Sequence, residues 1–215
     1  MIISHEDPIY IRRRNQIGDD RWNGAYYYSK EIVENIIPNV KTDRNWITIK
    51  VRKKGADHSI CFIHNNLTFE ETYEYMRNYK DVIYVVGLPD MVPRAQRFGQ
   101  TIYLPLSVDV DYVKQFAVEE KTKDIAFVGR RATRRNWLLP YTPDYIEGLP
   151  REELLKEMAK YKRVYAIGRT AIEAKILGCR VLPFHPRLMD PSIWKVLDNK
   201  DAAKILQKEL ISIDS

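Results

Sequence analysis

The stretch RVYAIGRTAIEAKILGCRVLPF, residues 163–184, decides the fold. Residues 163–167 (RVYAI) are rich in β-branched and aromatic side chains and predict a strand, which Gly168 ends. Residues 170–177 predict a helix, and residues 179–184 (CRVLPF) predict a second strand. A strand, a helix and a strand in this order are typical of a parallel βαβ unit.

Strand and helix patterns alternate along the rest of the chain as well. The near-continuous apolar runs at residues 81–86 (DVIYVV) and 124–128 (DIAFV) are typical of parallel strands covered on both faces. We therefore expect an α/β protein with parallel sheets and helices on their faces. Further strands are predicted at residues 8–14, 46–51, 60–63 and 101–106, and helices at residues 26–37, 69–79, 93–98, 152–160 and 193–210.

The charged stretch FAVEEKTK, residues 116–123, is weakly patterned and separates two such series of elements. It predicts two small Rossmann-like domains, residues 1–118 and residues 119–215. A chain of 215 residues is long enough to give each of them a hydrophobic core.

The composition is that of a globular protein, with 45% hydrophobic and 30% charged residues. It excludes the disordered, collagen-like and low-complexity classes. No run approaches the ~20 apolar residues of a membrane span, and the start MIISHED lacks the basic and apolar parts of a signal peptide. We therefore expect no membrane span and a cytoplasmic location. Cys61 and Cys179 lie in apolar runs and are predicted to be buried thiols.

The net charge of +6 favours anionic partners, whether nucleotide phosphates, nucleic acid or a membrane surface. One cluster of this charge is FVGRRATRR, residues 127–135, which places four arginines just beyond a predicted buried strand. Ligands of open α/β sheets bind at that end of the strands, and arginines there can clamp a diphosphate. A solvated basic turn or a site for nucleic-acid backbone is an equal interpretation of these residues.

A second candidate site lies where the strand at residues 163–167 runs into Gly168, Thr170 and Glu173. The N–H groups at a helix start can bind phosphate, and a carboxylate one turn further on can hold a ribose diol. The alternative, which the spacing alone favours, is an ordinary capping box formed by Thr170 and Glu173.

The stretches FVGR and GRTAIEAKILGCRVLP together resemble the carboxy-terminal half of GT-B glycosyltransferases. In that family a strand ending in Gly-Arg precedes basic ligands of the donor diphosphate, and a later helix binds the nucleotide sugar. The first half resembles the family in the same order. GDDRWNG, residues 18–24, resembles its first loop, and ICFIHNN, residues 60–66, resembles a strand that ends in an active-site histidine.

The resemblance implies an acceptor-side domain and a nucleotide-sugar-binding domain with a cleft between them, the final helix packing back on the first. It implies a hexosyltransferase-like enzyme that needs no metal or other cofactor and takes a UDP- or GDP-linked sugar. The acceptor hydroxyl could belong to a protein, a glycan or modified DNA. This chain departs from two family motifs. Leu106-Ser107 stand in place of the Asn-Gly of the linker between the domains, and Arg180 stands in place of the proline of the Gly-x-Pro-Val motif.

The resemblance also assigns the site residues, by position in the family motifs. His64, Asp19 and Asp20 are the catalytic candidates, with Asp90 as a further candidate base. Arg130 with Arg134 or Arg135 would neutralise the diphosphate. The donor-binding residues are Gly24, Gly129, Arg130, Arg134, Arg135, Gly168, Arg169, Thr170 and Glu173. The structural alternatives are a hydrogen-bonding role for His64 and turn capping for Asp19 and Asp20.

The chain departs from the family in two places. Tyr165 stands where retaining members carry the first of two glutamates, and the stretch between Arg135 and Glu152 is short. Some small phage-encoded glycosyltransferases are similarly reduced, and both inverting and retaining mechanisms stay open.

Two other functions are consistent with the sequence. One is a basic nucleic-acid-binding module, which is favoured by Arg12, Arg13, Arg14 and the arginines after Gly129. The other is a GT-B-like protein that has lost turnover, for which the missing upstream glutamate speaks.

Overall fold

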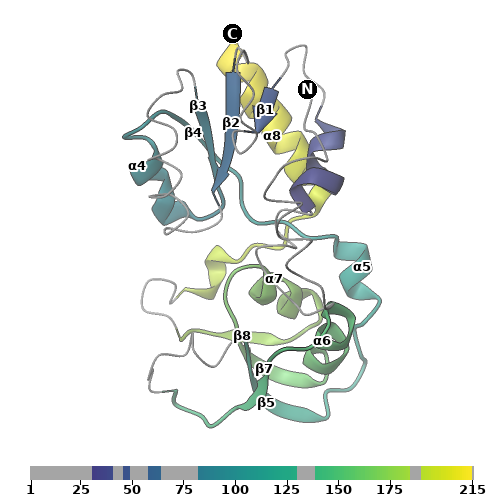
Figure 1. Cartoon of the computed structure of the whole chain (residues 1–215). Helices are drawn as coiled ribbons and strands as arrows, with labels where there is room; N and C mark the ends of the chain where they lie inside the picture. The colour runs from purple at the N-terminus through teal and green to yellow at the C-terminus, as the bar shows by residue number, and fades with distance from the viewer. Residues whose placement is uncertain are drawn as a thin grey trace. The chain divides into compact units, whose positions relative to one another are not determined.

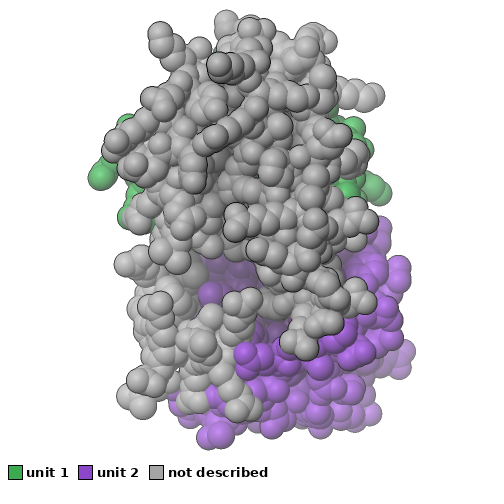
Figure 2. All heavy atoms as spheres, viewed as in Figure 1, with its two compact units in different colours: residues 1–16, 25–105, 199–215 green, residues 17–24, 106–198 purple. Residues whose placement is uncertain are grey.

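The computed structural model describes residues 31–40, 46–48, 58–63, 82–129, 139–184 and 190–214. Within these residues the chain is mixed α/β and forms two four-stranded sheets whose strands are all parallel (Figure 1). The predicted α/β class with parallel sheets is confirmed. The described residues divide into two compact units (Figure 2). Unit 1 holds those up to residue 105 and those from 199 onward, and unit 2 holds those from 106 to 198.

The sheet of unit 1 has its strands in sequence order, β1-β2-β3-β4. The central strand β3 matches the predicted apolar run, and Val85 and Val86 are completely buried because strands on both sides and packed side chains cover them. The last strand ends two residues before Pro105, which has no N–H to donate to a neighbouring strand. The strands are β1 (Trp46–Thr48), β2 (His58–Ile63), β3 (Val82–Val86) and β4 (Gln100–Tyr103).

Short helical segments pack around this sheet. Helix α4 lies against β3 and β4, where Met91 and Ala95 bury Tyr84 and Val86. Helix α8 packs along η1, and the two are joined by Glu31, whose carboxylate accepts hydrogen bonds from Asn35 at 2.6 Å and from Asn199. The segments are η1 (Glu31–Ile36), η2 (Ile37–Asn39), η3 (Pro89–Met91), α4 (Val92–Ala95) and α8 (Asn199–Asp214). The predicted strand at 8–14 and helix at 69–79 lie outside the described residues.

The sheet of unit 2 has the order β6-β5-β7-β8. Strand β5 matches the predicted apolar run at 124–128, and β7 begins two residues before the strand predicted at 163–167. Strand β6 has three residues and no alternating pattern that could have predicted it. The strands are β5 (Lys123–Val128), β6 (Asp144–Ile146), β7 (Tyr161–Tyr165) and β8 (Arg180–Leu182). The helices are α5 (Val110–Lys114), α6 (Arg151–Met158) and α7 (Arg169–Ile176).

Aromatic side chains form the core on one face of this sheet. The ring centroid of Phe127 lies 5.7 Å from that of Tyr145 and 5.0 Å from that of Phe184, and Tyr165 packs edge-on against Phe184. The alternate residues Ala126 and Val164 point to the opposite face and are completely buried as well. Both faces of β5 and β7 are therefore packed, and the sheet provides a fixed platform for the residues that follow its strands.

The final helix begins at Asn199. The sequence pattern predicts a helix over residues 193–210, with a break near Asn199 as an alternative, and the structure agrees with that alternative. Residues Pro191–Ile193 form a single 3-10 turn, η5, in which the carboxylate of Asp190 accepts the N–H and the hydroxyl of Ser192. The amine of Lys175 donates to the carbonyls of Pro191 at 2.5 Å and Trp194 at 2.6 Å. The Pro191 carbonyl also accepts the N–H of Trp194 at 3.2 Å, so it serves the 3-10 turn and the Lys175 amine together.

Lys121, in the stretch predicted to separate the domains, ties together the ends of two helices of unit 2. Its amine donates to the carbonyl of Ala159 after α6 at 2.8 Å and to that of Leu177 after α7 at 2.5 Å. It also lies 3.5 Å from the sulfur of Cys179, a buried free thiol whose pKa burial raises and the lysine charge lowers in part. A cation at two helix carboxyl ends also complements both helix dipoles.

We expect Lys121→Met to lower the free energy of unfolding by about 1–3 kcal/mol, because carbonyls at both helix ends lose their donor. Denaturant unfolding followed by circular dichroism measures this difference. Lys114→Met, on the exposed side of α5, is the matched control and should change stability by no more than about 0.5 kcal/mol. Equal losses of unfolding free energy in the two variants would show that the hydrogen bonds of Lys121 do not stabilise the fold.

Candidate functional site

The strand order of unit 2 locates a candidate site at one edge of its sheet. From β5 the chain passes to β6 on one side and then returns to β7 on the other side. Ligands of open α/β sheets bind beyond the carboxyl ends of the strands at such a switch point. Phe127 lies opposite Tyr165 in the parallel strands β5 and β7. The chain therefore leaves both strands at the same end of the sheet, through Gly129 after β5 and through Gly168 after β7. The structure thus places Gly129, the last described residue of the first predicted cluster, and Gly168 of the second cluster after the carboxyl ends of neighbouring strands. Arg130, Arg134 and Arg135 lie outside the described residues.

Both glycines at this edge have positive φ angles, 141° at Gly129 and 63° at Gly168. Other residues rarely adopt this conformation. A Cβ atom on Gly168 would meet only Leu106 at 3.8 Å, so the requirement for glycine comes from the backbone angle and not from lack of space.

Helix α7 begins at Arg169, with Gly168 as its N-cap, and no side chain caps it. The predicted capping box of Thr170 and Glu173 is therefore wrong. Thr170 is already the second residue of the helix, and Glu173 is its fifth, which is too far along to reach back to the N-cap. The carbonyl of Gly168 accepts hydrogen bonds from the N–H groups of Ala171 and Ile172. A glycine N-cap places no side chain over the first turn, as in many phosphate-binding helix starts.

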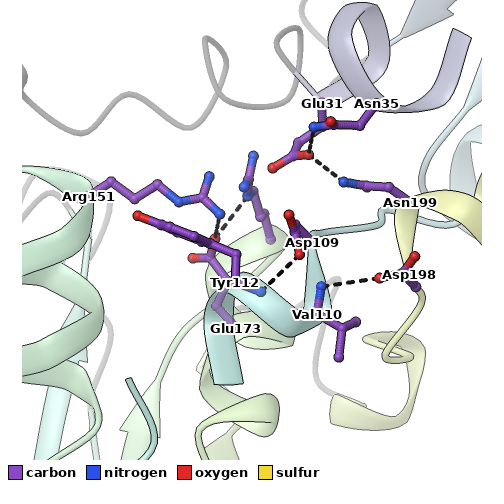
Figure 3. Close-up of polar contacts among 10 residues, drawn as sticks. Glu31, Asn35, Asp109, Val110, Tyr112, Arg151, Glu173, Asp198 and Asn199 are labelled. Carbon is purple, nitrogen blue, oxygen red and sulfur yellow. Dashed lines mark hydrogen bonds and ion pairs between the residues drawn. The ribbon is translucent and has the colours of Figure 1, made fainter. Parts of the chain in front are cut away.

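Glu173 is the centre of a buried ion cluster (Figure 3). Its Oε1 atom lies 2.9 Å from Nε of Arg169 and 3.1 Å from a terminal nitrogen of Arg151. Glu173 is 0% exposed, and the two arginines are 7% and 8% exposed. The Arg151 guanidinium in turn lies 5.4 Å from the ring centroid of Tyr112 on α5.

Two guanidinium groups contact one carboxylate oxygen in this cluster. The positive end of the α7 dipole lies at the same helix start. The second oxygen of Glu173, Oε2, is buried and accepts no hydrogen bond from any described residue. Guanidinium groups and a buried acceptor oxygen at one helix start suit a ligand that carries both an anion and a hydroxyl donor.

Sequence reasoning missed Arg151, although it selected Arg169 and Glu173. Arg151 starts α6, far from them along the chain, and no local spacing links it to α7. The available signal was a positively charged residue at the first position of a helix, where the helix dipole favours acidic residues such as Glu152 and Glu153.

Other residues selected from the sequence do not belong to this cluster or lie outside the described residues. Asp90, the further candidate base, is exposed on η3 in unit 1. Thr170 is buried in the first turn of α7, and Tyr165 lies in the aromatic core at the end of β7. The predicted residues outside the described part of the chain are Asp19, Asp20, Gly24, His64, Arg130, Arg134 and Arg135.

The described residues contain neither a cluster of metal ligands nor a helix that could span a membrane. No group of three or more histidine, cysteine, aspartate or glutamate side chains among them could hold a metal ion. No helix among them is both long enough and apolar enough to cross a membrane.

We expect Glu173→Ala to lower the free energy of unfolding by about 3–5 kcal/mol, because it leaves two guanidinium groups buried without their carboxylate. Calorimetry or denaturant unfolding measures the loss. Glu152→Ala is the matched control, since this glutamate pairs with Lys156 on the exposed side of α6 and should contribute less than about 1 kcal/mol. A loss at Glu173 as small as that at Glu152 would show that the cluster does not form.

The chain was compared with models of protein families, with curated proteins and with solved structures, and none of the three comparisons found a match. The geometry of the unit 2 edge and the motifs in the sequence are therefore the basis for assigning a function.

Proposed function

We propose that this protein is a GT-B-type glycosyltransferase, which moves a sugar from a nucleotide-sugar donor to an acceptor hydroxyl. The observation that carries the proposal is the buried cluster of Arg151, Arg169 and Glu173 at the start of α7. It lies in the first turns of α7, which follows β7 and the positive-φ Gly168, in a parallel sheet whose strand order reverses at β5. A nucleotide supplies both groups that this edge is suited to, a diphosphate and a ribose diol.

In the proposed enzyme, the diphosphate is held by Arg130 with Arg134 or Arg135. These arginines follow Gly129, whose segment leaves the sheet at the same edge. Guanidinium groups next to the diphosphate stabilise the charge that develops on the leaving nucleotide, which lets the reaction proceed without a metal. Thr170 and the first-turn backbone of α7 hold phosphate, and Oε2 of Glu173 accepts a ribose hydroxyl.

The first domain supplies the acceptor side of the proposed cleft, with Gly24 in the loop that approaches the donor. An inverting reaction needs a base that removes the acceptor proton, and His64, Asp19 and Asp20 are the candidates for it. A retaining reaction could use a donor phosphate oxygen in that role. The donor is UDP- or GDP-linked, and the acceptor is a protein, a glycan or modified DNA.

A second candidate is a GT-B-like protein that binds nucleotides without turnover. The position of Tyr165 favours it, because this side chain packs against Phe184 in the aromatic core where retaining members carry a glutamate. A protein of this kind would bind the donor and release no free sugar from it.

The experiment that tests the proposal is a thermal-shift panel with UDP, GDP, TDP, CMP and their sugars, followed by calorimetric titration. A ligand at 100 times its Kd stabilises the folded protein by about 2.7 kcal/mol, which is readily measured. We expect UDP or GDP to bind, and Glu173→Gln and Arg130→Gln each to weaken binding roughly tenfold. Glutamine is used at Glu173 because alanine would remove the buried side chain altogether.

Arg163→Gln is the matched control, because Arg163 lies in the middle of β7 and pairs with the exposed Asp124 and not with Glu173. Its nucleotide affinity should equal that of the wild-type protein. No response to any nucleotide, together with salt-dependent DNA binding, would replace the proposal with the nucleic-acid-binding module. Binding without donor hydrolysis or transfer would favour the protein without turnover.

A further inference from the structure

Arg151 occupies a position that its own helix does not explain. It is the first residue of α6, where the helix dipole disfavours a positive charge and where the adjacent Glu152 and Glu153 are the favoured type. Arginine is also seldom buried unless it is paired, yet Arg151 is more than nine-tenths buried. The reason for an arginine here must therefore lie in what it contacts outside α6.

Those contacts fix the guanidinium from two sides. A terminal nitrogen lies 3.1 Å from Oε1 of Glu173, and the Tyr112 ring lies against the guanidinium carbon. The backbone of Tyr112 is held at the start of α5, because its N–H donates to the capping carboxylate of Asp109 at 2.9 Å. The Tyr112 ring packs edge-on against Phe116, with ring centroids 5.3 Å apart. Figure 3 shows Arg151, Tyr112 and Glu173 turned toward one another.

Both arginines contact the same oxygen of Glu173. Arg169 alone could hold Oε1 from within α7, because the two residues are one turn apart. Arg151 approaches from a different helix and contributes an ion pair at 3.1 Å, not a hydrogen bond, so charges from two directions restrict the rotation of the carboxylate. The other oxygen, Oε2, is then held in one orientation and receives no hydrogen bond from the described residues.

We propose that Arg151 is a positioning residue, which orients the Glu173 carboxylate so that Oε2 accepts a hydroxyl from the ribose of the ligand. This inference rests on the proposed function. Glu173 is completely buried, so a ligand reaches Oε2 only when the atoms that cover it move aside. A carboxylate that is already oriented loses little further freedom when the hydroxyl arrives.

A residue that only joined α6 to α7 would behave differently. Its loss would weaken the fold and would reduce the affinity for every ligand of the site by a similar factor. Loss of a positioning residue reduces the affinity only for ligands that carry the ribose hydroxyls. The ratio of two dissociation constants therefore separates the two roles.

The test uses the full chain and calorimetric titration with two ligands. They are UDP or GDP, whichever the wild-type protein binds, and its 2′,3′-dideoxy analogue. We expect the wild-type protein to bind the ribonucleotide roughly tenfold or more tightly than the analogue, as a hydrogen bond to a charged group allows. In Arg151→Gln we expect this ratio to fall close to one, while the affinity for the analogue changes less than about threefold.

Graded variants make the result independent of one substitution. Arg151→Lys keeps the charge but lacks the planar guanidinium, and Tyr112→Leu removes the ring against it, so both should give intermediate ratios. Arg163→Gln, whose arginine pairs with Asp124 on the surface, should keep the wild-type ratio. If Arg151→Gln does not fold, these two milder variants decide the question, and wild-type ratios in both overturn the inference.

Three further results would overturn it. One is an unchanged ratio in a folded Arg151→Gln, and another is a loss of affinity by the same factor for both ligands. The third is a wild-type ratio near one, which refutes the role of Oε2 and leaves the proposed function standing. A wild-type protein that binds neither UDP nor GDP refutes the proposed function itself, and the inference fails with it.

Discussion

The carboxylate of Glu173 is the constraint on which the organisation of unit 2 depends. A completely buried carboxylate is tolerated only with charged partners, and it has them in Arg169 on its own helix and Arg151 on α6. Through the ring of Tyr112 the same cluster reaches α5. One acidic side chain thereby connects three helices that the apolar core alone would leave to pack in less defined ways.

Such a cluster is a poor means of gaining stability alone. Buried ion pairs can often be replaced by well-packed apolar side chains without loss, because the desolvation of the charges offsets their attraction. Leucine or methionine at these three positions could join α6 to α7 as firmly. In the proposed function the charges serve the ligand, because two guanidinium groups lie beside the start of α7 and Glu173 keeps an acceptor oxygen, Oε2.

The sequence predicts those parts of the fold that local pattern determines. The apolar runs became β3, β5 and β7, and the predicted helix at 170–177 lies within one residue of α7 at each end. Strand β6 was missed because it has only three residues, and they are extended because they pair with β5. Local pattern extended α8 back to residue 193, with a break near Asn199 as an alternative, and the break is what the structure has. The amine of Lys175, distant in sequence, binds the carbonyls of residues 191 and 194, a contact that local pattern does not predict.

The candidate site shows the same division between local and distant information. A threonine followed three residues later by a glutamate is a capping box by every local criterion, and here that interpretation fails. Gly168 can take the positive φ that starts the helix early, which moves Glu173 out of capping range. The glutamate then meets Arg151, a residue that no spacing rule connects to it. The helix start could be read from the sequence, but the contacts that give Glu173 its chemistry required the tertiary fold.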